Sequence, residues 1–268
     1  MAIEVFAPAK INLTLHVTGQ RDDGYHLLDS LVVFADFGDF LTVAPSDEME
    51  MTVSGPFAKG VPTDHRNLCW KAAELFGATV SIHLTKNLPH AAGIGGGSSD
   101  AAAVLNAMTL LFDRPCIGDP VSLGADVPVC QVGKAVRMQG VGEVLTPLDC
   151  EPLFAVLVNP RVEVPTPVVF KGLACKTNPK MSAPPKTGTT GWLTEQRNDL
   201  VGPAIAAAPV IHEVLQALSQ LEGVRLVRMS GSGATCFGVF DNRSHAEAMA
   251  HQLAKAHPDW WVRDVTLS

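Results

Sequence analysis

The stretch that decides the fold is KNLPHAAGIGGGSSDAAAVL, residues 86–105. Residues 79–85 before it alternate between polar and apolar side chains, as a half-buried strand does. Residues 104–112 after it place apolar side chains on one helical face. Between the two lie Gly93, Gly95, Gly96 and Gly97. Because glycine lets a ligand approach the main chain and a helix N-terminus presents unpaired N–H groups, the stretch predicts an anion site, most often for phosphate.

The glycines follow neither of the two commonest phosphate-loop patterns. No Gly-Lys-Ser/Thr comes after them, as a Walker A loop requires. Ser98 stands where the third glycine of the dinucleotide pattern would fall. Ser98, Ser99 and Asp100 are suited to cap the helix that follows. A flexible turn before a helix is the plainer alternative, and three consecutive glycines before two serines make it the weaker one.

Composition limits the class of protein. The chain has 268 residues, enough for one large domain or two modest ones, and a formal net charge of -7, so bulk nucleic-acid binding is not expected. Its six cysteines are scattered without a C-x-x-C pair, which favours buried thiols over a zinc or redox site. We find no signal-peptide pattern at the N-terminus and no apolar run of membrane-spanning length. We therefore expect a cytoplasmic protein without a membrane partner.

Three further stretches carry polar residues at defined positions. Residues 10–17 alternate strictly, so Lys10 and Asn12 share one face of a predicted strand, about 7 Å apart. A turn cluster at 19–24 precedes Tyr25-His26, and Asp126 lies in Gly-Ala-Asp-Val-Pro at 124–128. On pattern alone, residues 10–17 are explained by a strand with one solvent-facing side, and Tyr25-His26 by a surface loop. Further short strands are predicted at 31–35, 40–44 and 49–53, and a helix at 67–76.

These stretches together resemble the GHMP family of small-molecule kinases. Residues 86–105 are similar to the family's phosphate loop, APAKINL at 7–13 to its first signature and SGSGA at 230–234 to its third. The triple glycine, RDDGYH at 21–26 and Gly-Ala-Asp-Val-Pro are similar to one branch, whose substrate is 4-diphosphocytidyl-2-C-methyl-D-erythritol. Residues 113–120 depart from the family, because a longer helical stretch is usual there.

The resemblance implies an α+β fold with the two-domain GHMP kinase architecture. An N-terminal, ribosomal-protein-S5-like, ATP-binding domain would cover residues 1–150, and a C-terminal, ferredoxin-like, substrate-side domain residues 151–268. The sequence pattern supports the second domain. Strands at 153–158, 224–229, 235–240 and 261–267 and helices at 210–221 and 244–256 follow the ferredoxin-like order. Residues 176–191 have no periodicity and are predicted to be a loop or disordered.

The reaction implied is transfer of the γ-phosphoryl group of ATP, with Mg²⁺, to the 2-hydroxyl of that substrate, in the methylerythritol phosphate route to isoprenoid precursors. Asp126 would be the general base, and Lys10 would keep it ionised and orient the hydroxyl. The resemblance assigns the cytidine-bearing substrate to Asn12, Tyr25, His26, Thr166, Pro167 and Phe170. It assigns ATP to Asn67, Pro89, His90, Ala91, Ala92, Gly93, Ile94, Gly95, Gly96, Gly97, Ser98 and Ser99.

Several alternatives remain open. Another GHMP kinase, of the homoserine or mevalonate type, would share the loop, and a non-catalytic nucleotide-binding protein would share the fold. Phe170 is nearly as well explained by core packing, and Asn67 by a helix cap. Residues 194–200 can be a solvated turn, and residues 230–234 a plain hairpin. A serine hydrolase is disfavoured because no G-x-S-x-G occurs.

Overall fold

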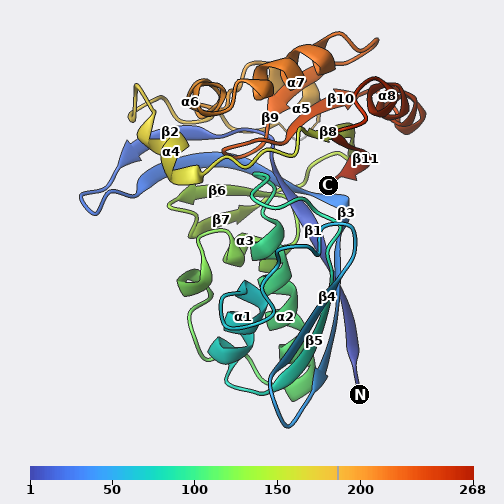
Figure 1. The fold of residues 1–268 in the computed structure, drawn as a ribbon. Helices are drawn as coiled ribbons and strands as arrows, with labels where there is room; N and C mark the ends of the chain where they lie inside the picture. The colour runs from blue at the N-terminus through green and yellow to red at the C-terminus, as the bar shows by residue number, and fades with distance from the viewer. Residues whose placement is uncertain (186) are drawn as a thin grey trace. The chain divides into compact units, whose positions relative to one another are not determined.

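The computed structural model describes residues 1–185 and 187–268, in two compact units (Figure 1). The first unit contains Met1–Lys10, Phe37–His90 and Gly95–Gly133, and the second contains Ile11–Asp36, Ala91–Ile94 and Lys134–Ser268. They are not consecutive halves, because strands β1 (Ile3–Asn12) and β3 (His26–Pro45) each run from one unit into the other. The division at residue 150 stays a prediction.

The first unit combines a small sheet with helices. The second half of β3 pairs antiparallel with β5 (Val80–Thr85), which pairs in parallel with β4 (Glu50–Ser54). Helix α1 (Leu68–Phe76) packs on α2 (Gly96–Phe112), which contacts α3 (Val127–Val132), and a 3-10 helix covers Pro120–Leu123. The alternation predicted for 79–85 is confirmed, since every second residue of β5 is buried. The β5–loop–α2 order predicted from residues 79–112 is therefore present.

One sheet of the second unit is built on the first half of β3. That half pairs antiparallel with β2 (His16–Gln20) on one side and β6 (Val136–Gly140) on the other, and β6 pairs with β7 (Val144–Pro147). The turn cluster at 19–24 connects β2 to β3, as predicted. Tyr25 and His26 therefore lie where the hairpin returns into β3.

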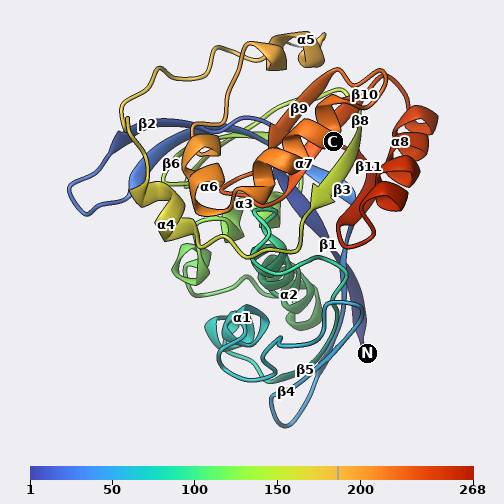
Figure 2. The same ribbon diagram turned by 45° about the horizontal axis from the view of Figure 1, so that its top comes forward.

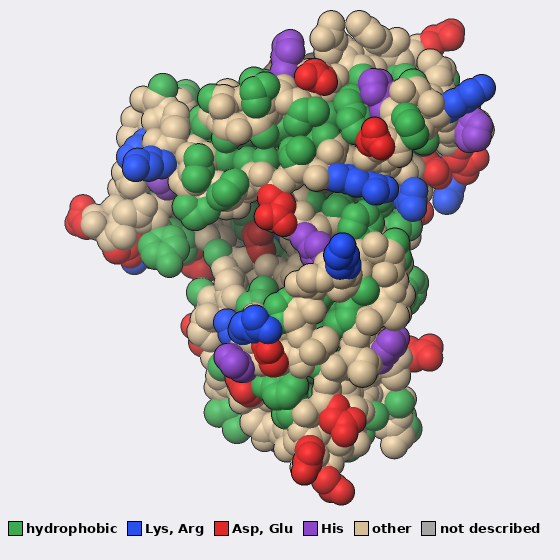
Figure 3. All heavy atoms as spheres, in the orientation of Figure 1, with side chains coloured by type: hydrophobic (Ala, Val, Ile, Leu, Met, Phe, Trp, Pro, Cys, Tyr) green, Lys and Arg blue, Asp and Glu red, His purple; other side chains and the backbone are tan. Residues whose placement is uncertain are grey.

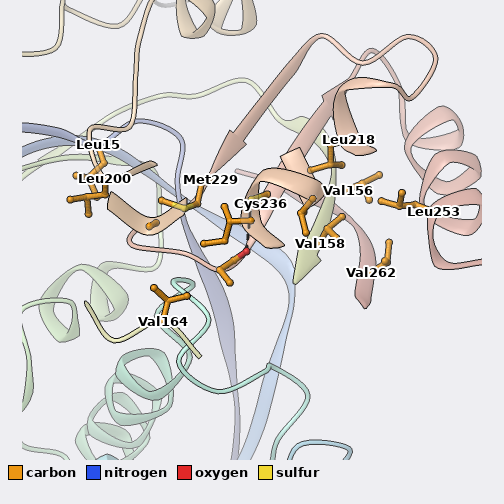
Figure 4. Packing of buried hydrophobic residues seen from close by; sticks show 14 of the residues in the cluster. Leu15, Val156, Val158, Val164, Leu200, Leu218, Met229, Cys236, Leu253 and Val262 are labelled. Carbon is orange, nitrogen blue, oxygen red and sulfur yellow. Dashed lines mark hydrogen bonds between the residues drawn. The ribbon is translucent and has the colours of Figure 1, made fainter. Parts of the chain in front are cut away.

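The remaining strands of the second unit continue the sheet from β3 in the order β11-β8-β10-β9, antiparallel throughout, with Leu267 of β11 opposite Ala35 of β3. The strands are β8 (Leu153–Asn159), β9 (Leu226–Met229), β10 (Cys236–Phe240) and β11 (Trp261–Leu267). Helices α7 (Val210–Ser219) and α8 (Arg243–Ala256) pack on it (Figure 2). Apolar side chains from these helices and strands form one buried cluster (Figure 4). The ferredoxin-like order predicted for residues 151–268 is confirmed.

Three short helices precede α7 and were not predicted: α4 (Thr166–Lys171), α5 (Thr189–Thr194) and α6 (Val201–Ala207). Residues 176–185, 187 and 188 form no helix or strand, as predicted, whereas α5 begins before the predicted loop ends at 191. Residue 186, which that prediction includes, lies outside the described residues. No helix in the described part of the chain is both long and apolar enough to span a bilayer.

Several predicted boundaries were wrong. Residues 31–35 and 40–44, predicted as two strands, belong to one strand, β3, and β1 runs unbroken through Ala7-Pro8-Ala9. A methyl group at Gly38 would lie 2.1 Å from the carbonyl oxygen of Ala7, so this glycine permits close strand contact instead of breaking the strand. The strand predicted for 10–17 is broken at residues 13–15, where Thr14 Oγ1 accepts from the N–H of Leu31 and Leu15 N–H donates to the carbonyl of Arg197.

Candidate active site

Lys10 and Asp126 form an ion pair in the first unit. Lys10 lies in β1, Asp126 directly precedes α3, and the Nζ–Oδ2 distance is 2.7 Å. The Lys10 side chain is 5% exposed and that of Asp126 36% exposed. The buried ammonium therefore holds a carboxylate that remains open to a ligand. A carboxylate held in this way can accept a proton from an alcohol.

The second half of the glycine loop begins α2. The helix starts at Gly96 with Gly95 as the N-cap residue, so the cap predicted at Ser98, Ser99 or Asp100 was wrong. Glycine is needed at position 95 because its φ is +63°, in the left-handed region. Gly96, Gly97 and Ser98 consequently begin the helix with N–H groups that lack intrahelical acceptors, and the N–H of Ser99 donates to the carbonyl of Gly95 at 2.8 Å as the first bond of the helix. This is the arrangement that binds phosphate at a helix start.

Two observations at the start of α2 support ligand binding there. A methyl group at Gly95 would lie 3.0 Å from Lys10 Cβ, so the ion pair and the loop are neighbours within the first unit. Ser99 is 1% exposed, and its hydroxyl has no hydrogen-bond partner among the described residues. A buried hydroxyl without a partner is costly, so Ser99 Oγ fits a phosphate oxygen or a metal ion held by phosphate. The described residues contain no cluster of three metal-ligating side chains.

The first half of the loop, residues 91–94, belongs to the second unit and contacts the 230–234 segment. Ser230 Oγ donates to the carbonyl of Gly93 at 3.0 Å, and the N–H of Thr235 donates to the carbonyl of Ala92 at 3.1 Å. Gly93 has φ +71°, and a methyl group there would lie 2.6 Å from the carbonyl oxygen of Gly233. The third signature is thus more than a plain hairpin, because it fixes the backbone of the loop.

Asn12 is held beside the same segment. Its N–H donates to Ser230 Oγ at 3.0 Å, and Nδ2 donates to Ser30 Oγ at 2.8 Å. Asn12 is 1% exposed, so the predicted polar face of this strand is not in solvent. Its Oδ1 has no partner in the part of the chain that the structure describes. This oxygen is therefore free to accept a hydrogen bond from a hydroxyl.

Tyr25, His26 and Phe170 lie in the second unit. Tyr25 is 62% exposed, an unusual position for a large ring. His26 is half-buried and stacks on Phe170 with ring centroids 4.9 Å apart. Burial, and then the charge of Lys176, lower the pKa of His26, so the imidazole is neutral near pH 7. Its buried Nε2 has no partner among the described residues, which leaves it available to a ligand.

Thr166 and Pro167 begin α4, the helix that carries Phe170. Thr166 Oγ1 and Ser232 Oγ are hydrogen-bonded at 2.9 Å. The predicted substrate segment and the third signature are therefore linked. The sequence did not indicate this link, because α4 is only six residues long and Ser232 is 66 residues away.

Asn67 caps α1, accepting from the N–H of Cys69 at 2.8 Å, while Nδ2 donates to the carbonyl of Pro62 at 2.7 Å. Both ends of the amide are thus used within the protein, and the cap explanation is confirmed. His90, earlier in the loop, is exposed and contacts the ring of Phe57 edge-on. An adenosine contact by Asn67 stays a prediction.

Residues 194–200 carry structural contacts that pattern reasoning missed. Asn198 is buried, and its Nδ2 donates to the carbonyls of Met229 and Gly231, both at 2.8 Å. Asp199 Oδ2 accepts from the N–H of Val17 at 2.7 Å. The segment is therefore not a solvated turn. The Asn-Asp pair was the available signal, but only the fold shows that it supports the third signature.

The surface charge agrees with a small ligand. On the face shown in Figure 3, acidic and basic side chains are interspersed instead of gathered in one broad basic area. This mixed pattern and the net charge of -7 do not favour a polyanionic partner.

Known proteins match this chain along its whole length. The GHMP kinases N-terminal domain matches residues 67–135 and the GHMP kinases C-terminal domain residues 194–259. A 4-diphosphocytidyl-2-C-methyl-D-erythritol kinase of Dinoroseobacter shibae is 58% identical, covering 98% of this chain and 94% of the relative. One of Ruegeria pomeroyi is 53% identical, covering 97% and 98%.

Solved structures give the same result. A crystal structure of 4-(cytidine 5'-diphospho)-2C-methyl-D-erythritol kinase matches with a TM-score of 0.81 and 35% identity, covering 99% of each chain. The homoserine kinase of Cytophaga hutchinsonii, at 18% identity and a TM-score of 0.69, shows the shared fold alone. The chain belongs to the 4-diphosphocytidyl-2-C-methyl-D-erythritol kinase family of the GHMP kinases.

Proposed function

We propose that this protein transfers the γ-phosphoryl group of ATP to the 2-hydroxyl of 4-diphosphocytidyl-2-C-methyl-D-erythritol. The observation that carries the proposal is the Lys10–Asp126 pair, 2.7 Å apart, beside the glycine loop, in a chain whose full-length relatives bear this kinase's name. Homoserine and mevalonate kinases share the fold at 18% and 12% identity, so fold likeness alone does not favour their substrates.

Asp126 is the proposed general base. The 2-hydroxyl oxygen attacks the γ-phosphorus while Asp126 accepts the hydroxyl proton, and the bond between the γ-phosphorus and the β,γ-bridging oxygen breaks to release ADP. Lys10 holds the carboxylate in place through the 2.7 Å ion pair. Because phosphoryl transfer depends chiefly on positioning and charge stabilisation, the N–H groups at the start of α2 contribute as much as the base.

Binding of the two substrates is assigned to separate groups of residues. The proposed ATP site is Asn67 and residues 89–99, with the phosphates at the helix start. Tyr25 and Phe170 offer ring faces for the cytosine, and a neutral His26 offers one donor and one acceptor to its edge. The unpartnered Asn12 Oδ1 supports a hydrogen bond to the methylerythritol part, with Thr166 and Pro167 lining that substrate's site.

Mg²⁺ is proposed as the metal that accompanies ATP. This ion usually takes most of its ligands from phosphate and water, so the absence of a three-residue cluster among the described residues fits it. Ser98 or Ser99 is the proposed contact, since both lie in the first turn of α2. When bound, the ion neutralises charge on the β- and γ-phosphates.

We also propose a cytoplasmic location and a division into domains near residue 150.

A substrate panel tests the proposed function. ADP release and phosphorylated product are measured with ATP, Mg²⁺ and one alcohol at a time: the cytidine conjugate, homoserine or mevalonate. We expect product from the cytidine conjugate alone, with one ADP per product. Product from homoserine or mevalonate instead would show a different GHMP kinase, and no product from any alcohol would favour a non-catalytic nucleotide-binding protein.

A further inference from the structure

A buried cluster of one ammonium and two carboxylates lies in the first unit, away from the Lys10–Asp126 pair. Lys86, which directly follows β5, is 4% exposed. Its Nζ contacts Asp39 Oδ2, from β3, and lies 2.6 Å from Asp100 Oδ2, from α2. Asp39 is 0% and Asp100 2% exposed. Three charged side chains buried together are rare enough to require an explanation.

Asp39 fixes the beginning of the loop. Its Oδ1 accepts from the N–H of Asn87 at 2.5 Å and from the N–H of Leu88 at 2.8 Å. The side chain of Asn87 in turn donates to the carbonyl of Gly38, beside Asp39, at 3.1 Å. The first loop residues are therefore bound to β3 by both backbone and side chain.

Asp100 fixes the end of the loop. It lies just beyond the first turn of α2, 14 residues after Lys86. A methyl group at Gly96 would lie 3.2 Å from Lys86 Nζ, so the ammonium touches the backbone where the helix begins. Lys86 thus joins both ends of the segment that contains all four glycines. Glycine-rich segments lose much conformational entropy when ordered, so a cross-link between their ends restricts them effectively.

Burial also changes the pKa of one carboxyl group of the cluster. Burial, together with the neighbouring Asp39, raises the pKa of Asp100 to about 8, despite the opposing effect of Lys86. Stability alone does not explain the cluster, because buried ionic groups replaced by apolar ones of similar volume often leave a protein equally stable.

We propose that Lys86, held between Asp39 and Asp100, is a positioning residue of the ATP phosphate loop. It keeps residues 86–88 and the start of α2 in the relative arrangement that directs the loop N–H groups at the phosphates. This inference rests on the proposed function in so far as the loop binds ATP, and it assigns Lys86 no contact with the reacting atoms.

The test compares nucleotide affinity with stability in four variants. Lys86→Met removes the ammonium, Asp100→Asn keeps the shape of the carboxyl, and Lys86→Met/Asp100→Leu replaces the buried pair by apolar groups. Leu105→Ala is the matched control, because Leu105 is fully buried on the same helix away from the loop. Affinity for a non-hydrolysable ATP analogue is measured by calorimetry, and KM for both substrates, kcat and Tm are measured beside it.

We expect Lys86→Met and the double variant to bind the analogue about two- to thirtyfold more weakly, the usual effect of a residue acting without ligand contact. The double variant should recover Tm only in part, because Asp39 stays buried without an ammonium, and it should not recover affinity. Asp100→Asn, the variant with the smallest change in volume, should weaken affinity in the same direction. Leu105→Ala should lower Tm and leave affinity and both KM values unchanged, and the KM for the alcohol should change in none of the four.

Two results would overturn the proposal: analogue affinity that follows Tm in all four variants, or affinity that is unchanged in Lys86→Met. Failure of the proposed function looks different. In that case the wild type phosphorylates no alcohol, yet it binds the analogue and the Lys86 variants lose that binding, which supports the positioning role by itself. A wild type that does not bind the analogue contradicts both.

Discussion

Replacing Asp126 by asparagine removes the proposed base with little change in shape. General-base catalysis contributes about 10²- to 10⁴-fold, so kcat should fall by that factor, or about 3–5 kcal/mol in the barrier. Stability should change little. The Asp126 side chain is 36% exposed but that of Lys10 only 5% exposed, so an ammonium left without a partner would be costly. The asparagine oxygen can still accept from Lys10, so the ammonium keeps a partner.

The assay is steady-state phosphorylation of the cytidine conjugate, with ATP affinity and Tm measured on the same preparations. Asp241→Asn is the matched control, because Asp241 pairs with Arg225 on the surface of the second unit. It should leave kcat unchanged. If Asp126→Asn keeps more than about a tenth of kcat while Tm and ATP affinity match the wild type, Asp126 is not the base.

Substitutions at three other positions test two residues of the site and one buried histidine outside it. Phe170→Ala removes a ring face that would stack on the cytosine, an interaction of about 1–3 kcal/mol. KM for the cytidine conjugate should rise by the corresponding factor, and KM for ATP should not change. An unchanged KM for the conjugate would show that Phe170 serves core packing only. Asn67→Ala should cost about 1 kcal/mol in thermal unfolding, whereas Asn67→Ser keeps a cap acceptor and should cost less; equal losses would contradict the cap. His16, whose pKa is lowered from 6.5 by burial and by Arg197, takes up a proton more readily when unfolded, so the stability of the protein should fall as the pH drops below 6.5. In His16→Gln, the free energy of unfolding from denaturant titrations should depend less on pH between about pH 7 and pH 5. The same pH dependence as in the wild type would contradict this role of His16.

Local patterns predicted the elements that depend on local chemistry. The alternation before the loop gave β5, the apolar spacing after it gave α2, and the turn cluster at 19–24 gave the β2–β3 connection. The ferredoxin-like order was predictable as well, since each strand and long helix of that sheet carries its own periodicity. Where packing follows sequence period, boundaries were correct to within a few residues.

Long-range contacts explain the failures. Separate strands were predicted at 31–35 and 40–44, yet Gly38 between them lets β3 pass close to Ala7. Residues 13–15 alternate like a strand, but bonds to Leu31 and Arg197 break it there. The α2 cap was placed too late, because a glycine in left-handed conformation starts the helix without a side-chain acceptor. No local pattern contains the partner residue in these cases.

In the candidate site too, motifs predicted individual residues, whereas the contacts between distant residues could not be predicted. Sequence reasoning reached Lys10 and Asp126 through motif resemblance, and the ion pair between them appears only in three dimensions. It did not reach Asp39, which lies between Gly38 and Phe40 in a strand and carries no motif. The contact of Asp39 with Lys86, 47 residues away, follows from the pairing of β3 with β5.

The most direct test of the proposed reaction is phosphorus NMR of the product formed from ATP and the cytidine conjugate, with carbon 2 of the methylerythritol labelled with ¹³C. One new phosphomonoester signal, coupled to the labelled carbon and matched by one ADP, is the predicted result. ADP with inorganic phosphate alone, or a phosphomonoester attached to another carbon, would contradict transfer to the 2-hydroxyl.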